Sequence, residues 1–315
     1  MNLSIVIVNW NSKDYVRKCL QSVAAGCPGE TPQIIVVDGA SFDGCGEMLA
    51  AEFPEAEYVQ SDENIGFGRC NNLGIERVRR DTVLFLNPDT EVRNGALTEL
   101  MLQLARFPNA GMVGARLLNT DGSLQTSCVQ SFPTPLNQAL DSEVLRRWFP
   151  NSKLWGTGEA FATCNPLPVE AVSGACIMMK TDVCRRVGAF SPEYFMYGED
   201  VDLCWKVYKD GLACIFVPGA HIVHHGGGSS TGAFSKSSTL WMRQSIVRFV
   251  GRRQGKSGEL VYRFSMAISS LVRLSLLVPA VLFAKGERRK RLRGPMSKWA
   301  AILRWSFGRG QLRVQ

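Results

Sequence analysis

The sequence has 315 residues, of which 45% are hydrophobic, so the chain can build one large domain with a full core, or one domain and an appendage. Its ten cysteines are irregularly spaced without a CxxC pair, which argues against a disulfide framework or a zinc ribbon. The net charge of +8 is unevenly distributed, because residues 246–315 contain 16 Lys and Arg but two Asp and Glu. The rest of the chain is mildly acidic, so this basic segment is expected to have a partner of its own.

The first residues, MNLSIVIVNW, lack a basic region, and their short apolar run is broken by Asn9 and Asn11, so we expect no signal peptide there. Most cysteines, for example Cys19, Cys176 and Cys204, have the setting of small core residues. Together these features predict a reducing, cytoplasmic environment.

Strands and helices alternate through the first 120 residues. Apolar, β-branched runs predict strands at 3–8, 33–37, 57–60 and 82–86. Apolar residues at helical spacing predict helices after Ser12 and over 47–53, 67–78 and 97–104. This alternation favours an α/β fold with a parallel sheet covered by helices on both faces.

The pattern changes after residue 120. Residues 125–170 are rich in proline and contain scattered aromatics, which indicates a long, partly irregular insertion that shapes a binding site. Strand character returns over 172–179 and 213–217, and a helix is predicted between them over 200–209, with Gly211 as its stop. Four residues of this helix are expected to face inward, namely Val201, Cys204, Trp205 and Tyr208.

Polar side chains stand where three predicted strands end, at Asn9 and Asn11, at Asp38, and at Asn87 and Asp89. In parallel sheets, ligands bind at the carboxyl ends of the strands. A lone Asp at a strand end is often a turn former or a helix cap. The functional alternative makes Asp89 a ligand for Mg²⁺ or Mn²⁺ that bridges a diphosphate, with Asn87 adding a neutral oxygen.

A pair of acids occurs in the stretch YGEDVDLC. Glu199 and Asp200 open the predicted helix, where the helix dipole favours acids in any case. The aromatic and apolar residues 194–197 come just before, and apolar surroundings raise the pKa of a carboxyl group and make it a better base. A catalytic carboxylate is therefore the alternative interpretation.

All three histidines of the chain, His221, His224 and His225, fall within the stretch AHIVHHGGGSS. Histidine is a frequent metal ligand and proton carrier. The glycines and serines that follow, at 226–230, are suited to close over phosphates through backbone N–H groups. The alternative is a polar loop that happens to be rich in histidine.

The stretch NIGFGRCNN, residues 64–72, partly matches a dinucleotide fingerprint. Asn71 stands at the position of the third glycine, and the stretch follows the third predicted strand instead of the first. These differences exclude a Rossmann NAD site. A turn that opens a helix next to a nucleotide remains as the interpretation.

Taken in chain order, the motifs resemble those of the inverting family 2 glycosyltransferases of GT-A fold, in particular the bacterial rhamnosyltransferase-like branch. The matching stretches read IVIVNWN, VVDGASFDG, NIGFGRCNNLG, LFLNPDT, VSGACIMMK, YGEDVDLCWK and IVHHGGGSS. They cover residues 3–231 and leave the basic tail outside. The resemblance implies a central, mostly parallel sheet flanked by helices.

The resemblance also implies roles for individual positions. Asn9 and Asp38 would hold the nucleoside, with Asp38 near the base. The remaining donor-binding positions would be Asn11, Asn64, Gly66, Asn71 and Asn87. Asp89 would bind the metal, and Asp200 would be the catalytic base with Glu199 beside it. His224 fits the third metal-binding position of the family, and His225 is the competing choice. Two departures are Gly39, where Asn is usual, and Asn-Pro-Asp, which offers one carboxylate to the metal instead of two.

The reaction implied is transfer of a sugar, with L-rhamnose as a candidate, from a dTDP-, UDP- or GDP-sugar to a growing glycan or a lipid-linked acceptor. A divalent cation offsets the charge of the leaving diphosphate, and one general base deprotonates the attacking hydroxyl, so a single displacement inverts the anomeric centre. A hydrolase would need two carboxylates flanking the glycosidic bond, whereas Glu199 and Asp200 are neighbours that diverge on a helix.

Two other functions were weighed. A sugar nucleotidyltransferase usually has a glycine-rich loop with Arg or Lys after the first strand, whereas this chain has VNWNSKDY there. A non-catalytic, nucleotide-binding membrane scaffold would not need Asp89, Asp200 and His224. The predicted organisation is a glycosyltransferase domain over 1–245, with a nucleotide-binding half (1–120) and an acceptor and catalytic half (121–245), followed by a tail over 246–315.

Residues 260–284 of the tail are largely apolar and about as long as a membrane span. Arg263 and Arg273 interrupt them, and Arg273 near the centre of a span would cost about 2.5–3.5 kcal/mol, so an amphipathic segment in the membrane interface is expected. The cluster GERRKRLRG, residues 286–294, suits anionic lipid headgroups, and Trp299 and Trp305 suit an interface. The prediction is peripheral association with the inner face of the cell membrane, without nucleic-acid binding; nucleic acid and a soluble packing helix are the rival explanations.

Overall fold

The structure, a computed structural model, describes residues 1–226 and 236–309 apart from Pro28, Glu30, Pro150, Asn151, Lys153 and Gly156. The chain forms two compact units. The first contains residues 1–132, 151–195 and 199–231, and the second contains 133–150, 196–198 and 232–315. The predicted tail over 246–315 falls in the second unit, and the functional division at residues 120 and 245 stays a prediction.

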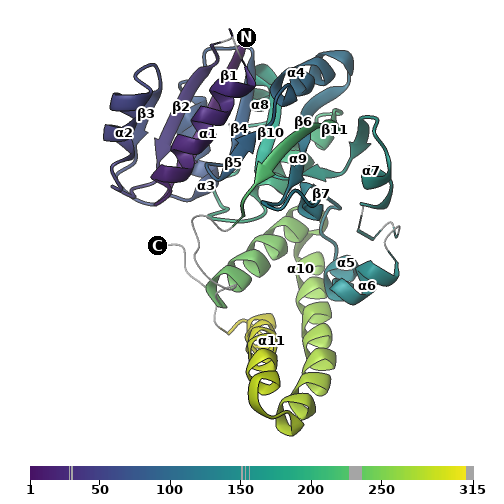
Figure 1. Ribbon diagram of the computed structural model, residues 1–315. Helices are drawn as coiled ribbons and strands as arrows, with labels where there is room; N and C mark the ends of the chain where they lie inside the picture. The colour runs from purple at the N-terminus through teal and green to yellow at the C-terminus, as the bar shows by residue number, and fades with distance from the viewer. Residues whose placement is uncertain are drawn as a thin grey trace. The chain divides into compact units, whose positions relative to one another are not determined.

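The first unit is built on one sheet whose strands follow the order β3-β2-β1-β4-β10-β6-β11-β5, with β8 paired to β11 (Figure 1). The strand bounds are β1 Leu3–Asn9, β2 Gln33–Asp38, β3 Glu57–Gln60, β4 Thr82–Leu86, β5 Thr90–Val92, β6 Ala110–Leu118, β8 Leu167–Val169, β10 Cys176–Lys180 and β11 Ala213–His224. A separate pair joins β7 Val129–Gln130 to β9 Ala171–Val172.

The sheet is mostly parallel, as predicted. Strands β3, β2, β1 and β4 run parallel to one another. Strand β10 lies antiparallel between β4 and β6, and β11 is parallel to β6. Strands β6 and β11 therefore run in the same direction as β4, and their carboxyl ends reach the same edge of the sheet.

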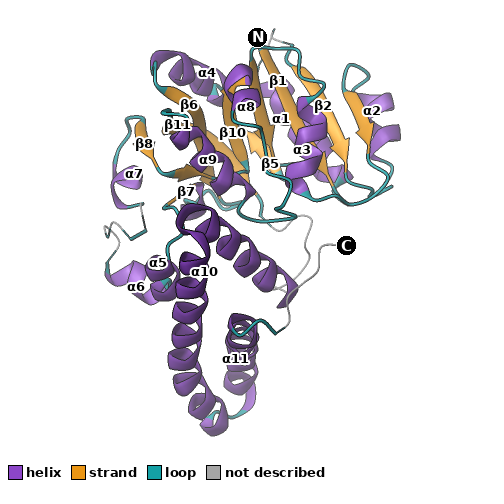
Figure 2. Ribbon diagram, turned by 180° about the vertical axis from the view of Figure 1, so that it is seen from behind, coloured by secondary structure: helices purple, strands orange, loops and turns teal. Residues whose placement is uncertain are grey.

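Helices cover both faces of the sheet, as the alternating sequence pattern predicts. Helices α1 (Lys13–Gly26) and α4 (Ala96–Arg106) lie on one face, and α3 (Phe67–Ile75), α8 (Thr181–Arg186) and α9 (Glu199–Lys209) lie on the other (Figures 1 and 2). Alternate residues of the central strand, Leu3, Ile5 and Ile7, join the core formed with α1 and α4. The remaining elements are α2 (Cys45–Glu52), the 3₁₀ turn Thr126–Cys128 and α7 (Gly158–Ala162).

Several strands differ from the sequence-based expectation: β5, β7 and β8 were not predicted, and β6 and β11 differ in ways that bear on the site. Strand β6 was not predicted, because glycines and Arg116 interrupt its apolar pattern. At Gly114 the side chain of Val172 occupies the space of a side chain, since Val172 Cβ would lie 2.5 Å from a Cβ added there. Strand β11 continues past the predicted end at residue 217 to His224, with an irregularity between Val217 and His221. The polar stretch that begins at His221 thus starts as a paired strand.

Two further expectations need correction. The strand predicted over 172–179 is split into β9 and β10 by residues 173–175. Tyr208 was expected to face inward but is 60% exposed, because its ring stacks on Trp205 at 5.3 Å and does not enter the core. The other inward-facing residues of α9, Val201 and Cys204, are buried as predicted.

The second unit is helical. Its elements are α5 (Pro135–Leu140), α6 (Glu143–Trp148), α10 (Lys236–Phe283) and α11 (Gly286–Ser306). Gly255 has φ +69° and divides α10 into two segments, and α11 folds back along the second of them (Figure 2). Tyr262 and Met266 of α10 pack with Ile302 and Trp305 of α11 in a small core of this unit.

Candidate active site

The carboxyl edge of the sheet gathers most of the predicted site residues of the first unit. Strand β1 ends at Asn9, which is paired in register with Asp38 at the end of β2. Strand β4 leads into Asn87, and β11 ends at His224. Because β10 is antiparallel, residues 173–175 that precede it reach this same edge.

Asn9 and Asp38 form the centre of a buried polar cluster. The Asn9 amide donates from Nδ2 to Asp38 Oδ2 at 2.5 Å, to Ser41 Oγ at 3.0 Å and to Asp43 Oδ1 at 3.1 Å. Asp38 Oδ1 accepts from Ser41 N at 2.7 Å and from Gln60 Nε2 at 3.1 Å. These contacts hold the Asp38 carboxylate at the sheet edge.

Asn11, the neighbour of this cluster in the sequence, is placed differently. Its backbone has φ +51°, a left-handed conformation that asparagine tolerates better than most residues, and its side chain is exposed. The structure therefore brings Asn9 and Asp38 together and leaves Asn11 on the surface at the end of β1.

The residues predicted to line the donor pocket, Asn64, Gly66 and Asn71, lie at the start of α3 and shape the backbone there. Asn64 Oδ1 accepts from Gly66 N at 3.1 Å, and buried Asn71 donates to Phe67 O at 3.0 Å. Gly66 has φ +85°, and a Cβ there would lie 2.2 Å from Phe195 O. Glycine is required because both the torsion angle and the close backbone approach exclude a side chain.

Asp89 and His224, predicted as metal ligands from opposite parts of the sequence, meet at this edge. His224 Nε2 lies 3.3 Å from Asp89 Oδ1 and 3.3 Å from Asn87 Nδ2. Asn87 Oδ1 is buried and has no hydrogen-bond partner. Strand β5 follows at once and pairs with β11 through Thr90 and His224, which is why residues far apart in the chain lie together.

His225 is held elsewhere. Its Nε2 lies 2.9 Å from Glu91 Oε1, its Nδ1 lies 3.0 Å from Thr120 Oγ1, and its backbone N donates to Asp89 O. Successive residues of a strand point to opposite sides, so His224 faces Asp89 and His225 faces away from it. The phosphate-closing role predicted for the glycines and serines falls on residues 226–230, of which 227–230 lie outside the described residues.

Glu199 and Asp200 open α9 at the same edge. Asp200 Oδ2 accepts from Gly174 N at 2.9 Å, and the adjacent Ala175 O accepts from Asn87 N at 3.0 Å. The turn at 173–175 thus connects Asp200 to the segment that carries Asp89. The approach is close at Gly174, where an added Cβ would lie 3.1 Å from Asp200 Cβ and would press on that side chain.

The two carboxyl groups have different environments. Burial, together with the neighbouring Asp200 carboxylate, raises the pKa of Glu199 to about 8, and Glu199 Oε2 is buried without a hydrogen-bond partner. Burial also raises the pKa of Asp200, but backbone N–H groups of Gly174 and Val201 stabilise its ionised form. These hydrogen bonds favour ionisation of Asp200, whereas burial favours the neutral form of Glu199.

Asp38, Asp43 and Cys45 form another group with ligand-type atoms within 4.8 Å of one another. Burial raises the pKa of Cys45 to about 12, so its thiol stays protonated, and a thiolate is the form that binds metal. Asp43 already accepts from the backbone N–H groups of Lys13 and Cys45. These satisfied contacts indicate a structural polar cluster more than a cation site.

Residues 4–187 match the family described as Glycosyl transferase family 2. The chain belongs to this family. It is 27% identical over 305 residues to the N-acetylglucosaminyl-diphospho-decaprenol L-rhamnosyltransferase of Mycobacterium tuberculosis, covering 92% of this chain and 97% of that protein. It is 25% identical over 260 residues to the rhamnosyltransferase WbbL of Escherichia coli K12, covering 79% and 93%.

Solved structures share the fold. The mannosyltransferase PcManGT of Pyrobaculum calidifontis, in complex with GDP-Man and Mn²⁺, superposes with a TM-score of 0.61 at 16% identity, covering 96% of this chain and 85% of that chain. Staphylococcus aureus TarS 1–349 in complex with UDP-GlcNAc gives a TM-score of 0.53 at 14% identity, covering 98% and 93%. The fold is therefore of the predicted GT-A type, and the chain is a family 2 glycosyltransferase, a family in which inversion is typical.

Three contributors to the site of this glycosyltransferase were not predicted as site residues. Asp43 contacts Asn9, Gly174 contacts Asp200, and Gln125 contacts His224. Asp43 and Gly174 lie inside motifs that carry the family resemblance. Gln125 lies in the irregular segment after residue 120, where no local pattern marks it.

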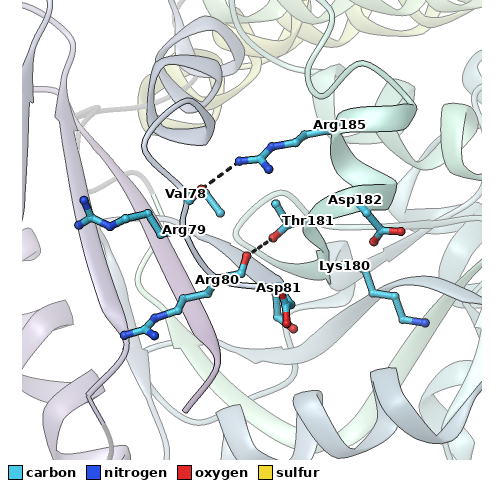
Figure 3. A pocket seen from close by; sticks show the side chains of 9 residues that line it. Val78, Arg79, Arg80, Asp81, Lys180, Thr181, Asp182 and Arg185 are labelled. Carbon is cyan, nitrogen blue, oxygen red and sulfur yellow. Dashed lines mark hydrogen bonds between the residues drawn. The ribbon is translucent and has the colours of Figure 1, made fainter.

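A cavity of about 490 Å³ lies at the opposite edge of the glycosyltransferase sheet, where β4 begins and β10 ends. Its cationic side chains do not converge: Arg185 turns to Val78 O at 2.9 Å, Arg79 and Arg80 point one way, and Lys180 points the other (Figure 3). This arrangement does not form an anion site, and it lies at the edge of the sheet opposite to the candidate active site.

Proposed function

We propose that the chain transfers a hexose from a nucleoside-diphosphate donor to a lipid-linked or growing glycan acceptor, with inversion, on the cytoplasmic face of the membrane. L-Rhamnose is the leading candidate for the sugar, because the two rhamnosyltransferases named above align over 97% and 93% of their own lengths. The family assignment leaves the nucleotidyltransferase and the non-catalytic scaffold without support.

The observation that carries the proposal is the single hydrogen-bonded path that joins Asp89 and Asp200. Asn87, two residues before Asp89, donates to Ala175 O, and the preceding Gly174 donates to Asp200. A leaving-group site and an attacking-group site therefore lie at one sheet edge within a few residues of backbone. Asn9 and Asp38 at the neighbouring strand ends are placed to hold the nucleoside, and Asn64, Gly66 and Asn71 support the donor side.

A divalent cation fits the group formed by Asp89, His224 and Asn87. The 3.3 Å between His224 Nε2 and Asp89 Oδ1 is close to the roughly 3 Å that separates neighbouring ligands of an octahedral ion with bonds of about 2.1 Å. The buried Asn87 Oδ1, which has no hydrogen-bond partner, is a candidate for the third ligand atom. These residues would hold Mg²⁺ or Mn²⁺, which offsets the charge of the leaving diphosphate when bound.

Asp200 takes the proton of the attacking hydroxyl in this proposal. Its raised pKa makes it a stronger base than an ordinary carboxylate, and it remains the charged member of the pair because Glu199 is protonated near neutral pH. Gly174 N–H fixes the carboxylate from one side at 2.9 Å and orients it. Because Glu199 is protonated near neutral pH, it adds no second negative charge to the site.

Replacing Asp89 with Ala is expected to abolish the metal-dependent part of nucleotide binding, because it removes the carboxylate that faces His224. Isothermal titration calorimetry with dTDP, UDP and GDP, each with and without Mn²⁺, measures this loss. Glu91→Ala is the matched control, since Glu91 lies two residues away and contacts His225 instead. Unchanged nucleotide affinity of Asp89→Ala in Mn²⁺ would remove Asp89 from the site.

The second unit supports membrane association. Its second α10 segment exposes an apolar stripe about 36 Å long, given 1.5 Å per residue, which comprises Leu260, Val261, Phe264, Ile268, Leu271, Val272, Leu276, Val278, Leu282 and Phe283. Cationic residues of α11, within 286–294, follow directly after this stripe. By length and composition, α10 also passes as a candidate membrane span.

The two arginines that interrupt the apolar run in the sequence, Arg263 and Arg273, do not face the stripe. Arg273 donates to Ala139 O and Asp141 O and lies over the Trp299 ring at 4.2 Å. Arg263 donates to Trp305 O and lies over its ring at 4.5 Å. Trp299 and Trp305 therefore act as packing partners inside this unit, and the uncharged face is free to enter an interface while the opposite face stays packed.

The full-length variant Phe264→Glu/Leu271→Glu is expected to lose co-flotation with vesicles that contain phosphatidylserine, because it places charge in the apolar stripe. Phe264→Glu alone should reduce binding, and Leu102→Glu, at an exposed leucine of α4, is the matched control with the same added charge. Vesicles without anionic lipid test the contribution of the basic cluster. Flotation of the double variant at the level of the unaltered chain would show that this stripe is not the membrane contact.

A further inference from the structure

Gln125 is the immediate neighbour of His224 on the side opposite to Asp89. Its Oε1 lies 2.7 Å from His224 Nδ1, whereas His224 Nε2 faces Asp89. A neutral imidazole carries one proton, so the partner of Nδ1 decides whether Nε2 presents an N–H or a lone pair. The orientation of the Gln125 amide therefore determines what the metal side of His224 can do.

The partners of Gln125 fix that orientation. Gln125 Nε2 donates to Asn119 Oδ1 at 3.1 Å and to the backbone carbonyl of His224 at 3.4 Å. A backbone carbonyl accepts and does not donate, so the group facing it must be the amide NH₂. Gln125 Oε1 is then the atom facing His224, and it requires a proton on Nδ1.

The hydrogen bonds of Asn119 likewise determine the orientation of its side-chain amide. Asn119 Nδ2 donates to Ser123 Oγ at 2.9 Å and toward Leu124 O at 3.5 Å, which leaves Asn119 Oδ1 as the acceptor for Gln125. Ser123 Oγ in turn donates to Asp121 Oδ1 at 2.6 Å. Hydrogen bonds from Ser123 lower the pKa of Asp121, so this carboxylate stays ionised and can only accept.

We infer that residues 119–125 form a positioning device that holds His224 in the Nδ1–H tautomer, so that the Nε2 lone pair points at the site between Asp89 and Asn87. The inference rests on the proposed metal-dependent function for its purpose, but the tautomer is a property of the protein without metal. All donors run in one direction, from His224 through Gln125, Asn119 and Ser123 to the Asp121 carboxylate. Gln125 touches no reacting atom, and it acts through His224.

The opposite tautomer would disable the site. An N–H on Nε2 would donate to Asp89 Oδ1 at 3.3 Å, and both proposed ligand atoms would then be occupied by each other. With the lone pair on Nε2, that atom can accept from Asn87 Nδ2 at 3.3 Å in the metal-free protein. Nε2 and Asp89 Oδ1 are then two electron-pair donors 3.3 Å apart, which suits a cation. Partners that orient a ligating histidine in this way typically change metal affinity by about 10- to 100-fold when they are removed.

The decisive measurement is ¹⁵N NMR of imidazole-labelled, metal-free full-length protein under alkaline conditions, where the imidazoles are neutral. The chain has three histidines, and a His224→Gln variant assigns the His224 signals. We expect Nδ1 of His224 to resonate as the protonated nitrogen and Nε2 as the nitrogen with a lone pair. The reverse pattern in the unaltered protein overturns the inference without any variant.

Gln125→Leu should shift His224 toward the Nε2–H tautomer and weaken Mn²⁺ binding by about 10- to 100-fold, measured by electron paramagnetic resonance. Gln125→Glu keeps an acceptor at Nδ1 and should retain the Nδ1–H form. Thr120→Ala, which removes the hydroxyl near His225 Nδ1 in the same turn, is the control and should leave His224 unchanged. A Gln125→Leu protein that folds and keeps the Nδ1–H form would refute the role of Gln125.

The two proposals fail separately. If His224 has the Nδ1–H form but the unaltered protein binds no Mn²⁺ with any of dTDP, UDP or GDP, the metal-dependent function is wrong and the positioning of His224 stands. If Mn²⁺ binds but His224 has the Nε2–H form in the metal-free protein, the positioning device is wrong and the metal site stands.

Discussion

Asp200→Asn is expected to lower kcat for sugar transfer by about 10²- to 10⁴-fold, the usual contribution of a general base, while donor binding stays intact. The asparagine has nearly the same size and can still accept from Gly174 N, so the loss is expected to be chemical and not structural. Transfer is measured by release of the nucleoside diphosphate in the presence of acceptor, and donor binding by calorimetry.

Asp182→Asn is the matched control, because Asp182 is an exposed acid on α8 whose partner, Arg186, lies 3.5 Å away. It should leave kcat within error of the unaltered protein. Asp200→Asn that retained full transfer would refute the assignment of Asp200 as base, even if Asp89 and His224 proved to bind metal.

Glu199→Gln is expected to become more stable relative to the unaltered protein as pH rises from about 5 to about 8. The pKa of Glu199 is raised from 4.5 to about 8, so between these values the folded chain holds a proton that the unfolded chain has released. The free energy of unfolding of the unaltered protein should therefore fall with increasing pH, by up to about 1.4 kcal/mol per pH unit from this group. Glutamine cannot ionise, so the variant lacks that contribution.

The measurement is urea unfolding of both proteins at several pH values, with the difference in free energy of unfolding plotted against pH. The amide adds a constant offset, because a buried NH₂ at the position of Oε2 would lack a partner. The slope and not the offset is therefore diagnostic. Glu47→Gln, at an exposed position of α2, is the control and should give a flat difference.

Local sequence patterns were sufficient to predict a site residue where it directly follows an apolar strand. The runs that form β1, β2 and β4 are apolar throughout because both faces of these strands are covered, and polar residues begin where each strand leaves the sheet. Asp38, Asn87 and Asp89 could therefore be placed at one edge before any coordinates. His224 and Asp200 joined them through the order of family motifs, and His224 and His225 were separated only by the pairing of β11 with β5.

Other features depend on long-range packing and leave no local trace. Strand β6 has glycines at 111 and 114 because Val207 and Val172 occupy the space of their side chains, and that pattern does not read as a strand. Gln125 acquires its role from a histidine 99 residues away. Arg273 interrupts an apolar run in sequence, yet it reaches backbone carbonyls about 130 positions earlier in the chain, so its charge never meets the exposed face.

The direction of β10, antiparallel to its neighbours β4 and β6, has a consequence for substrate range. The turn before it, residues 173–175, contacts the segment that carries Asp89 through Ala175 O and contacts the proposed base, Asp200, through the N–H of Gly174. In the proposed mechanism, main-chain hydrogen bonds therefore set the spacing between the metal side and the base. We expect selectivity for the donor sugar to depend on the side chains around this turn and not on a change in that spacing.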